Sequence, residues 1–216
     1  DATSSYAQVG MTTKQVADFA AAEIKKLGAI PAFLGQYGFP DVICISVNQA
    51  VVHGIPNQYV LKDGDVLSLD FGVKHQGMIT DAARTVIVGS ANKAKLKLVE
   101  TTKASLDAGI AVLKDGVFVG DIASSVQAVL DEAGLGIVRD LVGHGVGHQL
   151  HEDPNIPNYG RKGTGPQLKS GMTIAIEPMA TLGSYQVFTA QDDWTIETRD
   201  GSLAAHFEDT ILITDT

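Results

Sequence analysis

Two stretches of the sequence follow the same plan 106 residues apart, a spacing close to half of the chain's 216 residues. Residues 11–28 begin with threonines that can cap a helix, carry apolar residues at helical spacing and stop at a glycine, and residues 117–134 repeat this plan. The matching positions are Gly10 and Gly116, Val16 and Ile122, Ile24 and Leu130, and Gly28 and Gly134. The pattern predicts two similar halves packed face to face, each with an amphipathic helix.

A third helix is predicted over residues 91–113, which are rich in Ala, Lys and Leu. Its counterpart at the same spacing would lie before residue 8, so the first half is expected to lack an opening helix. Linkers and low-complexity stretches are absent from the sequence. We therefore expect residues 1–216 to form a single domain.

Strand patterns fill the rest of both halves. Residues 66–73 alternate as a half-buried strand does, and residues 81–88 follow the turn-forming KHQG at 74–77, so these stretches predict a hairpin. Further strands are predicted at residues 42–47, 173–176, 194–199 and 205–214, with Asp200-Gly201 as a two-residue hairpin turn. Strands mixed with segregated helices favour an α+β fold.

Composition narrows the class of protein. The 16 Lys and Arg against 25 Asp and Glu give a net charge of −9, and the densest basic stretch, 93–103, is spaced like a solvated helix face. Nucleic acid is therefore not expected as a partner. Cys44 is the only cysteine, which excludes an internal disulfide. Without a signal peptide or a long apolar span, the chain is expected to be a soluble cytoplasmic protein with no membrane contact.

Two aspartates mark the first hairpin as unusual. If the hairpin turns about residues 75 and 76, Asp70 and Asp81 face each other directly, and two opposed like charges destabilise a sheet unless a cation lies between them. A bridging metal ion would remove that penalty. The alternative is a turn one residue longer or shorter, which would place the aspartates on opposite faces as solvated residues.

Histidines and glutamates supply further candidate ligands. Residues 141–154 hold three histidines among glycines, of which His148 is interpreted as an ordinary core or surface residue rather than a ligand. Glu177 ends an apolar strand, where a carboxylate is unfavourable unless it is paired or bound to a metal. Glu208 has the same character, although Asp209 could be the inward residue instead. Carboxylates with histidine are the ligand set of dinuclear hydrolytic sites.

Seven motifs, in order, carry a family resemblance. They are HGIP at 53–56, LSLDFG at 67–72, TDAART at 80–85, GHGVG at 143–147, HEDPNIPNYG at 151–160, TIAIEPM at 173–179 and DDWTIETRDGSLAAHFEDT at 192–210. From about residue 10 to the end, the chain resembles type I methionine aminopeptidases of peptidase family M24. The resemblance implies a single catalytic domain with the pita-bread fold, in which pseudo-twofold halves of antiparallel sheet are covered by helices, but without the family's amino-terminal helix. It also implies removal of the first methionine from nascent chains and peptides with a small second residue.

The resemblance also implies which residues bind the metal ions and which take part in catalysis. It assigns two divalent metal ions, which could be Co, Mn, Fe or Zn, to five ligands: Asp70, Asp81, His144, Glu177 and Glu208. Asp81 and Glu208 would bridge the ions, and the ions would lower the pKa of a water molecule. Glu177 would also carry protons, while His151 and His53 would contact the substrate and steady the tetrahedral intermediate.

A methionine pocket should be apolar and polarisable. The matching positions in this sequence are Phe39, Cys44, His53, Leu150 and Trp194. The chain departs from the family at Gln36 and Phe39, where tyrosine is frequent, and at Leu150, where an aromatic residue is frequent. His206 stands where a glutamine commonly precedes the last ligand by two, and it could perturb the site or act as a weak ligand.

Three alternative functions compete with this interpretation. A prolidase-like dipeptidase of the same fold usually carries an added amino-terminal domain. A pita-bread binding protein without activity usually loses ligands, whereas all five are present here. A metal site without turnover is disfavoured by His53 and His151 at their matching places. The favoured hypothesis is a monomeric metalloenzyme that acts on amino-terminal methionyl peptides.

Overall fold

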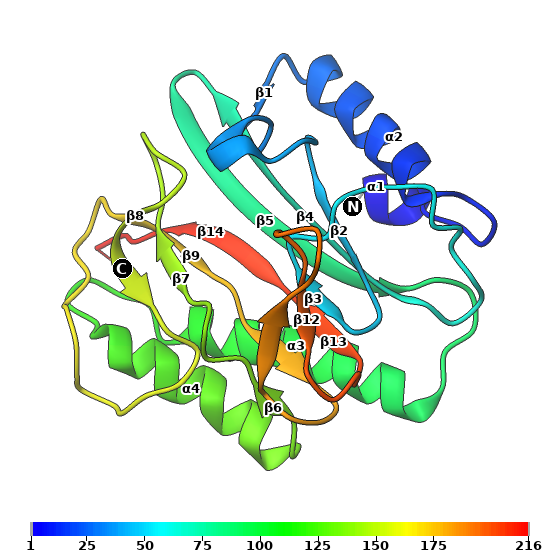
Figure 1. The fold of residues 1–216 in the computed structure, drawn as a ribbon. Coiled ribbons are helices and arrows are strands. Elements are labelled where there is room, and N and C mark those ends of the chain that lie inside the picture. Colours follow the sequence, from blue (N-terminus) through cyan, green and yellow to red (C-terminus); the bar gives the residue numbers. More distant parts are fainter. Residues whose placement is uncertain (1, 216) are drawn as a thin grey trace.

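In the computed structural model, which describes residues 2–215, the helices lie on the two halves of a central sheet (Figure 1). They are α1 (Ala2–Tyr6), α2 (Thr13–Lys26), α3 (Lys93–Ala111) and α4 (Val119–Glu132), with a short 3-10 helix η1 (Gln36–Gly38). Both ends of α4 follow the matching ends of α2 by 106 residues, as predicted. A capping box starts α2, because the Thr12 hydroxyl accepts from Gln15 N and the Gln15 side chain accepts from Thr12 N.

The first half contains a short helix where the sequence predicted none. Helix α1 spans five residues, and its place matches the last turn of α3 in the second half. Tyr6 of α1 stacks on Phe19 of α2 with ring centroids 4.0 Å apart, which holds the two helices together. The prediction therefore missed this turn, because five residues carry too little periodicity to indicate a helix.

Antiparallel strands form one large sheet and two small ones. The large sheet has the order β1-β4-β5-β14-β9-β7-β8, with β2 paired to β4, and the small sheets are β13-β10-β6 and β11-β12-β3. The strands are β1 (Ile30–Pro31), β2 (Cys44–Val47), β3 (Ala50–Val52), β4 (Val66–His75), β5 (Met78–Ile87), β6 (Gly136–Ile137), β7 (Gly143–Gly145), β8 (Glu152–Ile156), β9 (Thr173–Ile176), β10 (Met179–Thr181), β11 (Val187–Thr189), β12 (Ile196–Thr198), β13 (Ala204–His206) and β14 (Glu208–Leu212). The two halves meet where β5 pairs with β14.

The register of the β4–β5 hairpin differs from the predicted one by two residues. Gln76 and Gly77 form the turn with φ of 50° and 87°, so Asp70 lies opposite Ala83 and Asp81 lies opposite Gly72. Direct opposition of the two aspartates was therefore a wrong prediction. Side chains alternate with a period of two, so a shift of two keeps both aspartates on one face. The alternative with opposite faces is excluded.

The predicted Asp200-Gly201 hairpin is also wrong. A turn does form there, because the Asp200 carboxylate accepts from Ser184 N at 2.6 Å and from Ser202 N at 3.0 Å. However, β12 before the turn pairs with β3 and β11, whereas β13 after it pairs with β10. The turn thus passes the chain from one small sheet to the other. The predicted strand at 205–214 is divided at Phe207 into β13 and β14.

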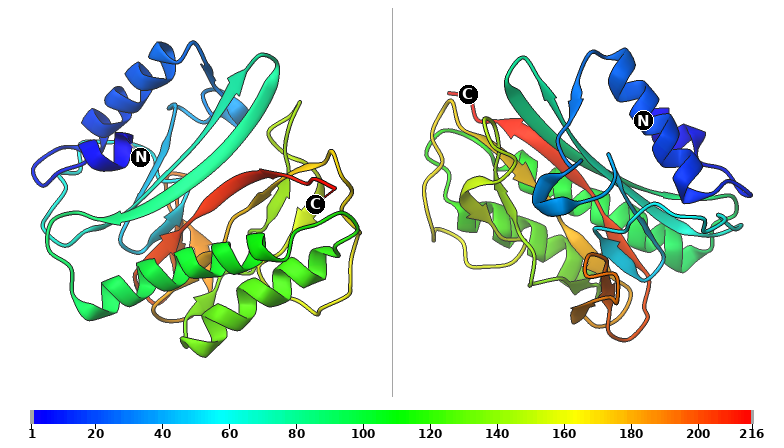
Figure 2. Two further views of the ribbon diagram at one scale, coloured as in Figure 1. Left: turned by 180° about the vertical axis from the view of Figure 1, so that it is seen from behind. Right: turned by 45° about the horizontal axis from the view of Figure 1, so that its top comes forward.

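Each half has its own apolar core beneath its helices. Figure 2 shows α2 on one half and α3 with α4 on the other. Helix α2 buries its apolar face on β2 and β4, while α3 and α4 cover β9, β10, β13 and β14. The first cluster includes Val16, Ala17, Ala20, Ile43, Ile45, Leu67 and Leu69, and the second includes Leu106, Ile122, Val126, Leu130, Ile174 and Ile176. Burial of these side chains provides the main stabilisation of both halves.

Gly109 allows α3 to approach α4 closely, which gives a test of the packing. A Cβ at position 109 would lie 2.9 Å from Val126 Cγ2 and 3.4 Å from Ile122 Cγ2. Gly109→Leu should therefore lower the free energy of unfolding by about 1–3 kcal/mol in denaturant titrations, because the core would be overpacked. Ala104→Leu, on the exposed face of the same helix, is the control and should change stability by less than about 0.5 kcal/mol. Equal midpoints for Gly109→Leu and wild type would contradict this packing.

Candidate metal centre

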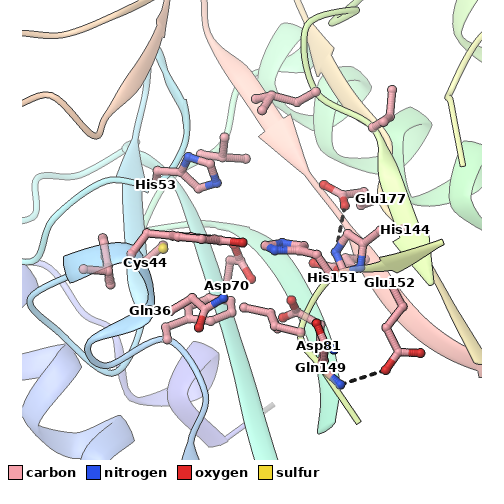
Figure 3. Close-up of a pocket in the computed structure, with 18 of the residues that line it drawn as sticks. Gln36, Cys44, His53, Asp70, Asp81, His144, Gln149, His151, Glu152 and Glu177 are labelled. Carbon is pink, nitrogen blue, oxygen red and sulfur yellow. Dashed lines mark hydrogen bonds and ion pairs between the residues drawn. The ribbon is translucent and has the colours of Figure 1, made fainter. Parts of the chain in front are cut away.

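One pocket of about 760 Å³ collects all the residues predicted for the site. Its lining draws on both halves of the chain, and Figure 3 shows Cys44 and His53 on one side facing His144, His151 and Glu177 on the other. The predicted residues in the lining are Phe39, Cys44, His53, Asp70, Asp81, His144, Leu150, His151, Glu177, Trp194 and Glu208. His148 is exposed and is not among the lining residues.

Three of the carboxylates form a row across the adjacent strands β4, β5 and β14, which we call the acidic row. Asp70 on β4 and Glu208 on β14 both lie opposite Ala83 of β5, and Asp81 lies two residues before Ala83 on the same face. Asp70, Asp81 and Glu208 are 7%, 4% and 2% exposed. The small methyl group of Ala83 leaves the space between the strands to the acidic side chains. Strand pairing thus brings together residues that are more than 120 positions apart in the sequence.

The neighbours of Glu208 settle which acidic residue of β14 points inward. Asp209 faces the other side of the sheet and forms an ion pair with Arg84 Nη2 at 2.5 Å. Arg84 Nη1 also donates to the Glu208 carbonyl oxygen at 2.6 Å. This clamp fixes β14 on β5 with Glu208 toward the pocket, so the alternative of an inward Asp209 is excluded.

His144 and Glu177 complete the group from the second half. The His144 Nδ1 lies 2.9 Å from the Gly145 carbonyl oxygen, so Nδ1 carries the proton and the Nε2 lone pair is left free. Nε2 faces Glu177 Oε1 at 3.4 Å, the contact dashed in Figure 3. Ligand atoms of Asp81, His144 and Glu208 all lie within 4.8 Å of one another. This spacing would let a single ion contact all three.

The electrostatics of the pocket favour cations. Burial raises the pKa of Asp81 to about 7, and burial together with the neighbouring carboxylates raises the pKa of Asp70, Glu177 and Glu208 well above their ordinary values. Among residues 2–215, Asp70 Oδ1 and Glu208 Oε1 are buried without a hydrogen-bond partner. Buried acceptors of this kind, next to a free imidazole nitrogen, fit oxygen- and nitrogen-binding divalent metal ions.

Three further histidines surround this group. His53 follows β3 with φ of 59°, and the next residue must be glycine because a Cβ on Gly54 would lie 2.3 Å from the Ile45 carbonyl oxygen. The His151 ring lies edge-on to His144 with centroids 4.4 Å apart. Burial lowers the pKa of both His53 and His151, which favours uncharged rings at neutral pH.

His206 occupies a different position from the other histidines. It is 1% exposed and lies behind the two glutamates rather than in the pocket lining. Its Nε2 is 3.9 Å from Glu177 Oε2 and 3.9 Å from Glu208 Oε2. Burial lowers its pKa to about 3, so the ring is uncharged.

The apolar side of the pocket is a small aromatic cluster. Phe39 meets Trp194 edge to face with centroids 5.1 Å apart, and Cys44 lies directly across the β2–β4 ladder from Asp70. Phe33 and Tyr37 also line the pocket, although the sequence did not single them out. The only available signal was the GQYG turn, where Tyr37 has a φ of 50° between two glycines.

Comparisons with known proteins agree with this geometry. The model of Metallopeptidase family M24 matches residues 1–215. A methionine aminopeptidase of Clostridium acetobutylicum is 47% identical over 97% of this chain and 84% of its own length. The crystal structure of a methionine aminopeptidase from Thermotoga maritima has a TM-score of 0.95 and 45% identity, covering 96% of this chain and 84% of that chain.

A more distant solved structure shares the same fold. The prolidase of Pyrococcus horikoshii has a TM-score of 0.75 and 26% identity, covering 97% of this chain and 53% of that chain. Together, these likenesses confirm the predicted α+β pita-bread fold.

The raised carboxyl pKa values predict how the metal-free protein responds to pH. A carboxyl whose pKa is raised on folding stabilises the protein below its unfolded pKa and loses that contribution as pH rises through its folded pKa, about 7 for Asp81. The buried histidines act in the opposite direction, but their effect is complete above their ordinary pKa of 6.5. The thermal midpoint in excess chelator should therefore fall between pH 6.5 and about pH 8.

Asp81→Asn provides the matched control, because it removes one titrating carboxyl. Its midpoint should fall less steeply over the same interval. A wild-type midpoint that rises with pH there would contradict the assignment of raised pKa values to these carboxyls.

Proposed function

Because the chain belongs to metallopeptidase family M24, and within it to the methionine aminopeptidases, we infer that it is a hydrolase that removes methionine from the amino terminus of peptides and proteins. The observation that carries this inference is the 47% identity to a named methionine aminopeptidase across nearly the whole chain. The clustered carboxylates and imidazole of the pocket support it with a fitting chemistry.

We further propose that two divalent ions bind at Asp70, Asp81, His144, Glu177 and Glu208. Support comes from the 4.8 Å group of ligand atoms and from the buried oxygens that lack partners within residues 2–215. When bound, such ions act as Lewis acids that polarise a carbonyl and lower the pKa of water. The donor set suits Co, Mn, Fe and Zn alike.

The remaining steps, proton transfer and stabilisation of the oxyanion, would fall to three side chains. A carboxylate oxygen of Glu177 would take the proton of the attacking water and pass it to the leaving amine. His151 and His53, as uncharged rings, would each offer an N–H to the substrate carbonyl and the developing oxyanion. Both rings line the pocket, and His151 is already in contact with His144.

The methionine side chain would occupy the aromatic cluster. Phe39, Cys44, Leu150 and Trp194 line this part of the pocket, and three of them are buried at 4–5% exposure. Ring edges and the thiol sulfur suit a polarisable thioether. We also propose that the enzyme is a monomer with a single catalytic domain. It would act on nascent chains in the cytoplasm and prefer substrates with a small second residue. Within residues 2–215, no helix has the length and apolarity to cross a membrane.

A prolidase-like dipeptidase is the main rival. It is less well supported, since the prolidase likeness has 26% identity against 47% for the methionine aminopeptidase. A non-catalytic binding protein is disfavoured because the full set of predicted ligands lines the pocket.

Peptide hydrolysis tests the proposal. Purified protein supplied with Mn²⁺ or Co²⁺ should release methionine from Met-Ala-Ser, measured by chromatography of the products, and excess chelator should abolish release. Asp81→Ala and Glu208→Ala should each lower kcat/KM by at least about 100-fold, because each would remove a proposed ligand of the metal ions.

The control is His148→Ala, whose exposed side chain lies outside the pocket lining. It should keep wild-type activity. Full activity in chelator would refute metal dependence, and cleavage of an Xaa-Pro dipeptide in place of Met-Ala-Ser would favour the prolidase reading.

A further inference from the structure

His206 is a buried polar residue without an evident partner. It is 1% exposed, and within residues 2–215 neither ring nitrogen has a hydrogen-bond partner. Leaving a buried donor unsatisfied costs stability, so such groups call for an explanation. The ring does not line the pocket, which argues against direct contact with the substrate.

The His206 ring lies at the same distance from the carboxylates of two glutamates. His206 Nε2 is 3.9 Å from Glu177 Oε2 and 3.9 Å from Glu208 Oε2. The other oxygen of Glu177, Oε1, faces His144 Nε2 at 3.4 Å. The Glu177 carboxylate therefore lies between two imidazoles, and His206 is the neighbour that both glutamates share.

The backbone of His206 is tied to the strand that carries Asp81. His206 N donates to Thr85 Oγ1 at 2.8 Å, and the same hydroxyl donates to the His206 carbonyl oxygen at 2.7 Å. Thr85 lies on β5 and is itself buried. These bonds fix the backbone of His206 relative to the acidic row, so the ring projects from a paired strand rather than from a flexible loop.

We propose that His206 is a positioning residue of the metal site, whose Nε2–H holds the Oε2 atoms of Glu177 and Glu208 and thereby aims their other oxygens at the metal ions. The inference rests on the proposed metal site. A shift of about 1 Å would bring Nε2 within hydrogen-bond distance of either carboxylate. His206 would position the glutamates rather than bind the ion itself. The ligand atoms close enough to share one ion belong to Asp81, His144 and Glu208, and His206 is not among them. Outer hydrogen bonds of this kind tune metal affinity.

His206→Gln and His206→Met make a matched pair of variants. The two side chains have nearly the same length, but only glutamine carries an N–H donor. Titration of chelator-stripped protein with Mn²⁺ should give a Kd raised about 10–100-fold for His206→Met, because the support for both glutamates is lost. His206→Gln should bind Mn²⁺ nearly as tightly as wild type, as should the control His148→Ala.

The outcomes separate this inference from the proposed function. Wild-type affinity in a folded His206→Met protein would overturn the positioning role alone, whereas a wild type that binds no Mn²⁺ would overturn the metal site as well. If His206→Met does not fold, ¹⁵N NMR of the wild-type imidazole decides the question. On addition of Zn²⁺, Nε2 of His206 should keep its proton, and loss of that proton would show that His206 binds the metal directly.

Discussion

Repulsion among buried carboxylates is the constraint on which the rest of this structure depends. Asp70, Asp81 and Glu208 share one face of the central sheet around Ala83, and Glu177 reaches the same pocket from the second half. Burial alone raises the pKa of these groups, and their mutual repulsion adds to it, so the ionised state needs a compensating charge. The divalent cations proposed for the pocket would supply that charge.

Contacts between β5 and β14 keep the acidic row in place. Arg84 binds both the Asp209 carboxylate and the Glu208 carbonyl oxygen. The Thr210 hydroxyl accepts from Asp81 N and donates to Asp81 O, each at 2.8 Å. Because these contacts join β5 to β14, they also join the two halves of the chain. The same pairing therefore assembles the fold and positions the candidate ligands.

Much of this arrangement could be predicted from the sequence, and the failures have physical causes. The 106-residue spacing correctly predicted α2 and α4, since long amphipathic patterns persist in the fold. The hairpin was expected, but its register was not, because any pair within KHQG could form the turn and only the positive φ of Gln76 and Gly77 decides it. Whether Glu208 or Asp209 points inward depends on Arg84, a partner 125 residues away. The position of His206 behind two glutamates likewise depends on long-range contacts that no local pattern indicates.

The most direct test of the proposed cation site is to measure whether metal binding displaces protons from the buried carboxyls. At about pH 6 the metal-free site should retain protons on its carboxyls, since the pKa of Asp81 is about 7 and those of its neighbours are also raised. Calorimetric titration with Mn²⁺ in buffers of different ionisation enthalpy reports the number of protons released. Release of at least one proton per chain is expected at this pH, and the number should fall as pH rises. Binding without proton release at pH 6 would contradict the protonated state of the metal-free carboxyls.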